Sequence, residues 1–104
     1  MIVNNMDEVF KLLLNDDYKG SIYLKSDEEV QEFKKITVIV YENKVYAALG
    51  YKETDIENVI YLFEMVCTNK EVALRLVDDY TLKETLTNML LEKISMEEIE
   101  ELLK

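Results

Sequence analysis

The sequence predicts an α+β fold: a mixed four-stranded sheet with helices packed on it, in the order α-βββ-α-β-α-α. Three observations lead to this prediction. Helix-starting polar residues recur three positions before a glutamate, two alternating apolar segments flank a short polar turn, and one more alternating segment follows a helical pattern. Because a helix would precede this last strand, it is expected to join the three-strand meander by a crossover. Residues 1–104 are expected to form a single domain.

Four helices are predicted from capping pairs, each followed by apolar residues of helical period. The pairs are Asn5 with Glu8, Thr54 with Glu57, Thr81 with Glu84, and Ser95 with Glu98. The apolar stripes are Met6, Val9, Phe10 and Leu13; Ile56, Val59, Ile60, Phe63 and Cys67; Leu82, Leu86, Met89 and Leu90; and Met96, Ile99, Leu102 and Leu103. The second stripe is the strongest, so a helix is expected over 54–67. The short helix within 94–104 either folds back on the domain or serves as an interaction element.

Strands are predicted within residues 20–26, 35–42, 44–51 and 71–79. Gly20 suits the turn before the first of them. The second and third flank a hairpin turn in which Asn43 tolerates a left-handed backbone. In the last, Val72, Leu74 and Leu76 alternate and are expected to face inward. Residues 26–35 are ambiguous between a charged connection and a short helical turn, and we expect a short helical turn or an ordered loop there.

Small residues gather at the end of the third predicted strand, in the sequence YAALGY. Ala47, Ala48 and Gly50 would let a helix approach the sheet closely, or would let a ligand approach the backbone. Because no phosphate-binding glycine pattern follows, close packing is the preferred interpretation.

Composition excludes several classes of function. The chain has 22 acidic and 12 basic residues and a net charge of −10, which opposes direct binding to nucleic acid and to anionic membranes. No apolar run is long enough to span a bilayer, no signal peptide is evident, and a lone cysteine fits a reducing compartment. A cytoplasmic protein is therefore expected.

The chemistry of common active sites is missing from the sequence. There is no histidine, and the two glycines cannot build a nucleotide-binding loop. Cys67 ends the second predicted apolar stripe, which predicts a buried, inert thiol. The paired acids mostly flank predicted helix starts, where they stabilise the helix dipole. We therefore expect no catalytic residue, no cofactor and no metal site.

Tyrosines and a single arginine are the candidate interaction residues. The chain has seven tyrosines, and Tyr41, Tyr46, Tyr51 and Tyr61 lie on or near the hairpin and the second predicted helix. They either border a binding surface, where tyrosine is enriched, or edge the core with wet hydroxyls. Arg75, the only arginine, either contacts a partner's carboxylate or pairs with an acid of its own chain.

Residues 9–66 resemble PATAN-type domains and their archaeal relatives of unknown function. The resemblance rests on Leu12 to Leu14, Gly20, Ile22, Leu24, Val38 to Tyr41, Val45, Ala47, Ala48, Gly50 and Tyr51. Two features depart from that pattern: the hairpin turn lacks the usual Asp-Gly, and the charged segment 26–35 is longer. The resemblance implies a non-catalytic regulatory or protein-interaction module and contributes no catalytic residue.

The expected function is a non-enzymatic, intracellular regulatory or protein–protein interaction module whose partner is another protein or a second copy of the chain. Under this hypothesis, Tyr46→Ala or Tyr51→Ala should weaken partner binding with little loss of fold. The alternative is an acidic mimic that occupies the nucleic-acid site of a basic protein, since the charge of −10 is high for so small a chain.

Overall fold

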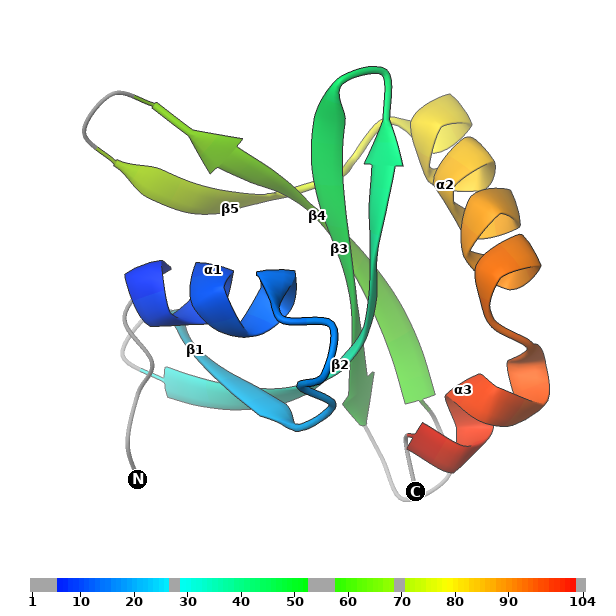
Figure 1. The fold of residues 1–104 in the computed structure, drawn as a ribbon, viewed down its shortest axis with the longest axis horizontal. Coiled ribbons are helices and arrows are strands. Elements are labelled where there is room, and N and C mark those ends of the chain that lie inside the picture. The colour runs from blue at the N-terminus through cyan, green and yellow to red at the C-terminus, as the bar shows by residue number, and fades with distance from the viewer. Residues whose placement is uncertain (1–5, 27–28, 53–57, 69–70, 103–104) are drawn as a thin grey trace.

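A computed structural model describes residues 6–26, 29–52, 58–68 and 71–102. Its elements are α1 (Met6–Leu14), β1 (Ser21–Ser26), β2 (Glu29–Tyr41), β3 (Lys44–Lys52), β4 (Asn58–Cys67), β5 (Val72–Leu76), α2 (Tyr80–Lys93) and α3 (Met96–Leu102). The five strands form one curled sheet in the order β1-β2-β3-β4-β5, and every neighbouring pair is antiparallel (Figure 1). The α+β class is as predicted, but the mixed four-stranded sheet with a crossover is wrong.

The error comes from the segment predicted as the second helix. Residues 58–67 form strand β4, which pairs with β3 on one side and β5 on the other. Val59 to Phe63 are apolar throughout, so they satisfy a helical period and a strand period equally. Ile60 and Leu62 pack against one core while Tyr61 and Phe63 pack against another, a two-sided burial that only the strand provides. The capping pair Thr54–Glu57 lies outside the described residues.

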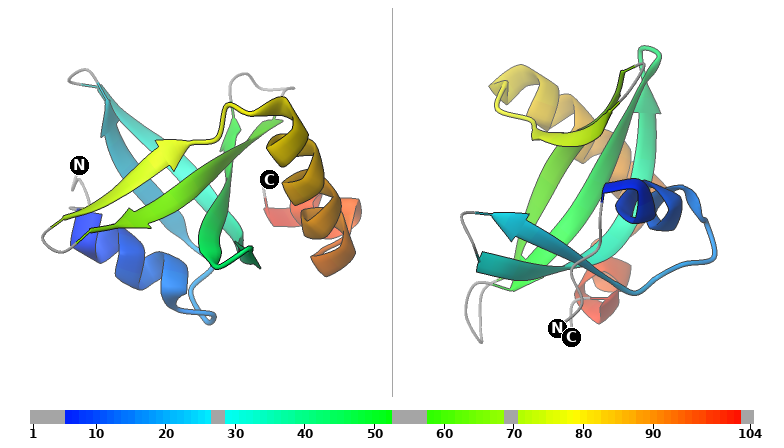
Figure 2. Two further views of the ribbon diagram at one scale, coloured as in Figure 1. Left: turned by 90° about the horizontal axis from the view of Figure 1, so that it is seen from above. Right: turned by 90° about the vertical axis from the view of Figure 1, so that its left-hand side faces the viewer.

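Two hydrophobic cores lie on opposite faces of the sheet, one under α1 and the other under α2 and α3 (Figure 2). Along β3, Ala47 and Leu49 face the α1 core, while Tyr46 and Ala48 face the core under α2 and α3. Both alanines are fully buried. Small side chains in the middle of β3 therefore accommodate close layers on both faces, in agreement with the packing interpretation.

Strand β2 spans 13 residues and includes most of the segment expected to be a helical turn or loop. Its first half pairs with β1, from Glu29 opposite Ser26 to Lys34 opposite Ser21. A register shift between Lys35 and Thr37 marks a bulge, after which β2 continues beside β3. Phe33 is buried on the α1 face, so this charged segment is held as a strand by its few apolar side chains.

The local signals at the other elements have mixed outcomes. The hairpin turn is as predicted, with Glu42 and Asn43 both at positive φ. Ser95 caps α3 by accepting the Glu98 N–H at 3.2 Å, also as predicted. Helix α2 is capped by Asp79, whose carboxylate accepts the Leu82 N–H at 2.9 Å, two residues before the predicted cap. None of the helices in the described ranges is long and apolar enough to cross a membrane.

Gly20 is needed for a reason other than a special backbone angle. It has no positive φ, but a Cβ placed there would lie 2.6 Å from the Tyr18 hydroxyl oxygen. The hydroxyl of Tyr18 in turn donates to the Ser21 carbonyl. The glycine therefore leaves room for the tyrosine that fastens the connection between α1 and β1.

Candidate functional site

An aromatic groove lies on the α1 face of the sheet. Its floor holds four rings: Phe33 of β2, Tyr51 of β3, and Tyr61 and Phe63 of β4. The Phe33 ring is the centre of this group, with its centroid 5.2 Å from that of Tyr51 and 6.0 Å from those of Tyr61 and Phe63. The last two contacts are edge-to-face, the arrangement that ring quadrupoles favour. The floor is therefore a packed and well-defined surface.

The walls of the groove come from four elements. The lining comprises Met6 of α1, Leu24 and Lys25 of β1, Gln31 of β2, and Leu74 and Leu76 of β5. The cavity measures about 490 Å³, which falls in the range of ligand sites. Leu76 is 49% exposed even though it faces this apolar space. Ring faces and aliphatic side chains of the groove are therefore exposed to solvent, and the side chains of the lining leave the cavity open.

Three exposed acids lie close in sequence to residues of the groove lining. Asp7 and Glu8 follow Met6 in the first turn of α1, and both are exposed. Glu29 lies two residues before Gln31 on the same face of β2 and is also exposed. One base, Lys25, belongs to the lining. Acids thus outnumber bases among these residues, as they do in the chain as a whole.

The structure separates the predicted interaction residues instead of gathering them. Tyr51 and Tyr61 lie in the aromatic groove. Tyr46 is buried in the opposite core with 3% of its surface exposed, and Tyr41 packs against that same core. Arg75 lies elsewhere, on β5. The four tyrosines therefore do not border one surface.

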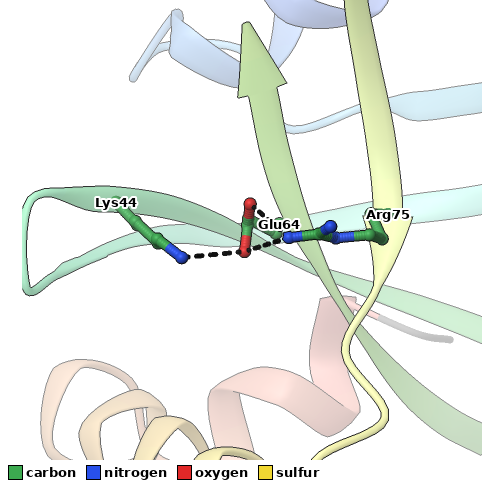
Figure 3. A network of polar contacts seen from close by, with 3 residues as sticks. All are labelled: Lys44, Glu64 and Arg75. Atoms are coloured by element: carbon green, nitrogen blue, oxygen red, sulfur yellow. Dashed lines mark hydrogen bonds and ion pairs between the residues drawn. The ribbon is translucent and has the colours of Figure 1, made fainter.

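Arg75 pairs with an acid of its own chain, which was one of the two expected outcomes. Its Nη2 lies 3.0 Å and 3.2 Å from the two carboxylate oxygens of Glu64, the residue opposite it on β4 (Figure 3). Lys44 approaches the same carboxylate at 3.7 Å. Both cations are largely exposed, so this network contributes little to stability.

Sequence reasoning missed Phe33, Phe63 and Leu74 as site residues. Phe33 lay in the ambiguous segment 26–35, and Phe63 was assigned to the stripe of a helix. Leu74 was expected to face inward, which is correct, but inward here means toward the groove. The signal that could have found them is the alternation of Tyr61 and Phe63 on one face of a strand.

Cys67 also differs from its expected environment. It ends β4 and is exposed, whereas the helical interpretation placed it in the core. Its Sγ lies 3.8 Å from the Thr68 carbonyl oxygen. No group of three potential metal-binding His, Cys, Asp or Glu side chains occurs within the described part of the chain.

Lys35 is a buried base that fastens α1 to the sheet. With 6% of its surface exposed, it donates from Nζ to the carbonyl oxygens of Leu12 at 3.1 Å and Asn15 at 2.6 Å. The Leu12 carbonyl lies in the last turn of α1 and Asn15 is the first residue after the helix, so the cation meets the negative end of the helix dipole. Burial lowers the pKa of Lys35 below its usual 10.5, and Asp16 opposes part of that change.

Stability should depend on alkaline pH through two buried groups. Between the folded pKa of Lys35 and 10.5, the unfolded chain holds a proton that the folded chain lacks, so the free energy of unfolding should rise with pH. Burial, helped by Glu64 and Glu42, raises the pKa of Tyr46 above 10.0. Above pH 10.0 the folded chain therefore keeps a proton that the unfolded chain loses, and the free energy of unfolding should fall.

Urea denaturation between about pH 8 and pH 11 measures both trends. Because they overlap, each is read as the difference between the wild-type chain and a variant. Lys35→Met should abolish the rise, and Tyr46→Phe should abolish the fall. A variant with the same pH profile as the wild type would contradict the assignment of that trend.

No family model, curated protein or solved structure matches the chain. A function is therefore inferred from the shape and charge of the groove itself.

Proposed function

We propose that the chain is a non-enzymatic, intracellular protein-interaction module that holds a basic, amphipathic segment of a partner protein in the aromatic groove. The observation that carries this proposal is a floor of four packed rings beside the half-exposed Leu76. Clustered aromatic side chains are the residues that most often anchor protein interfaces. The resemblance of residues 9–66 to PATAN-type domains is the basis for proposing a regulatory role.

The chemistry of the lining favours binding over reaction. Apart from the two tyrosine hydroxyls, the polar side chains of the lining are Lys25 and Gln31. Such a surface offers apolar contact and a few hydrogen bonds, which suits the side chains of a docked segment.

Charge selects the kind of segment. Asp7, Glu8 and Glu29 are exposed and lie one or two residues from lining residues in the sequence, and the chain as a whole carries −10. A partner segment with apolar side chains on one face and lysines or arginines on the other would place its apolar side chains in the groove and its basic side chains near acids. Long-range attraction would also speed its encounter with the groove.

A designed peptide of leucines and lysines in helical period, carrying one tryptophan, tests the proposal. The chain contains no tryptophan, so the fluorescence of the peptide reports its binding alone. Leu76→Lys should raise the dissociation constant about tenfold, as expected for an interface residue worth roughly 1.4 kcal/mol. Leu91→Lys is the matched control, since it makes the same charge change at an exposed leucine of α2.

Three results decide the outcome. Weaker binding in Leu76→Lys with unchanged binding in Leu91→Lys supports the groove. Equal binding by both variants, or no binding of the peptide by the wild-type chain, overturns it. A control peptide with serine at every leucine position should bind weakly if at all, because it keeps the charge but loses the anchors.

The acidic mimic is the second candidate. Helix α3 exposes Glu97, Glu98, Glu100 and Glu101, which add to the general negative charge. A mimic would bind through these charges without apolar anchors. The serine peptide would then bind as well as the leucine peptide, and both would dissociate at moderate salt.

A further inference from the structure

Strand β2 has a free edge along its second half. Strand β1 pairs only with Glu29 to Lys34, whereas β2 continues to Tyr41. Beyond the bulge, β2 therefore has β3 on one side, and no strand of the described residues pairs with its other side. Figure 1 shows β1 leaving β2 well below the hairpin. An edge of this kind exposes backbone donors and acceptors that can pair with another strand.

The hairpin register shows which backbone groups point outward. The two-residue turn makes Tyr41 and Lys44 a hydrogen-bonded pair, so Ile39 and Thr37 also bond to β3. Val38 and Val40 must then direct their N–H and C=O groups away from β3. One contact confirms this alternation: the Val38 carbonyl oxygen accepts from Lys93 Nζ at 2.6 Å. The backbone groups of Val40 have no partner among the described residues.

The side chain at this edge is also unusually open. Val40 is 65% exposed although it lies in a strand between the buried Ile39 and the half-buried Tyr41. No charged residue occurs from Thr37 to Tyr41. The bulge between Lys35 and Thr37 and the Lys93 contact protect the beginning of this edge, whereas no charged side chain of the strand itself protects it from Thr37 to Tyr41.

We infer that this edge binds the same edge of a second copy of the chain, so that the two sheets continue into one. Antiparallel pairing about a two-fold axis at Ile39 places Val38 of each copy opposite Val40 of the other. Both valines direct their backbone groups outward, so each such pair forms two hydrogen bonds. The exposed Val40 then meets a second β-branched side chain on the same face, a favourable cross-strand pair.

The space beside Ile36 favours this register. Ile36 of one copy comes opposite Glu42 of the other. A cavity of about 490 Å³ lies beside Ile36 and can receive the turn that carries this glutamate. Its charged lining comprises Lys19, Lys35 and Lys93 with Asp16, Glu98 and Glu101. The Val40 N–H of the second copy would replace Lys93 Nζ as the donor to the Val38 carbonyl oxygen. Lys93 could then pair with Glu42 of the second copy.

Added salt should change the affinity of the dimer and the affinity of peptide binding in the groove in opposite directions. Each copy carries −10, so the copies repel one another at low ionic strength. Screening shortens this repulsion to roughly 10 Å at 0.1 M salt, and the backbone pairing is unaffected. Added salt should therefore strengthen the dimer while it weakens the binding of a basic segment in the groove.

Sedimentation equilibrium of the whole chain over a concentration series, at low and at moderate salt, tests the inference. The measured mass of the wild-type chain should reach twice 12.3 kDa as the concentration increases. This should occur at a lower protein concentration in moderate salt than in low salt. Val40→Pro removes an outward N–H without removing a bond to β3, and proline is tolerated on edge strands. It should raise the dissociation constant of the dimer roughly tenfold or more, through lost backbone hydrogen bonds. Leu91→Lys, on exposed α2, should leave it unchanged.

Val40→Lys provides a second variant should the proline prevent folding, which circular dichroism would show. It keeps the strand and brings a charge to each side of the axis, so it should also give monomers. A wild-type chain that stays monomeric throughout would overturn the inference. So would a folded Val40→Lys or Val40→Pro chain that dimerises like the wild type. Because neither variant touches the groove lining, peptide binding in the groove is an independent readout.

Discussion

Replacing Tyr46 with alanine is expected to lower the free energy of unfolding by about 3–5 kcal/mol, the usual cost of removing a buried aromatic side chain. The ring lies in the core under α2 and α3, among Ile39, Ala48 and Leu62, and is 3% exposed. The small side chain of Ala48 in the same core cannot fill the cavity that Tyr46→Ala leaves. The close-packed sheet also prevents the core from collapsing into that cavity. Urea denaturation of the variant measures the loss.

Two controls separate packing from other effects. Tyr46→Phe keeps the ring, so it should cost no more than about 1.5 kcal/mol, the contribution of one hydrogen bond. Tyr80→Ala removes the same side chain at a position that is 80% exposed, and should change stability by less than about 0.5 kcal/mol. Equal losses in Tyr46→Ala and Tyr80→Ala would show that Tyr46 is not a core residue.

This expectation reverses the one drawn from the sequence, where Tyr46 was a surface residue whose loss would spare the fold. The sequence places Tyr46 and Tyr51 on one hairpin strand five residues apart, and an odd separation sends two side chains to opposite faces. The pattern therefore already excluded a common surface. What it could not show is that both faces are covered, because that depends on where α1 and α2 pack.

Elements with a strong local signal were predictable. Helices α1, α2 and α3, the hairpin and strand β5 follow from periodicity and turn residues, and the cap of α3 at Ser95 was also correct. The predicted cap of α2 was two residues late, and the predicted cap of α1, Asn5, lies outside the described residues. Strand β4 was not, because Val59 to Phe63 fit both periods and the preceding Thr54–Glu57 pair favoured a helix. Pairing with β3 on one side and β5 on the other makes this segment a strand. Strand pairing depends on residues distant in the sequence, so the local pattern could not show it.

The candidate site was predictable only in part. Tyr51 and Tyr61 were identified from the abundance of tyrosine, and they do line the groove. The groove itself exists because β1, β5 and α1 converge across the curled sheet from distant parts of the chain. Neither composition nor periodicity predicts that these elements come together. The net charge predicts many exposed acids, but it does not say where they lie relative to the groove.

Leu90→Ala is expected to lower the free energy of unfolding by about 2–5 kcal/mol, whereas Leu91→Ala should change it by less than about 1 kcal/mol. The two leucines are neighbours in α2, but Leu90 is 1% exposed and Leu91 is 41% exposed. Both replacements make the same change in helix propensity, so their difference isolates the burial of one helix face.

The pair also tests how α2 is docked. Leu86 and Leu90 lie one turn apart and pack with Ile36, Ile39 and Ile99 in the same core. The truncated Leu90 would leave a cavity beneath the junction of α2 and α3, lined by side chains from strand and helix that cannot move together to close it. If Leu91→Ala proved the more costly change, α2 would have to be rotated about its axis by roughly 100°, the angle between consecutive helical residues. A core assigned to Leu86, Leu90 and Ile99 could not survive that result, because a rotated helix would turn two of its members toward the solvent.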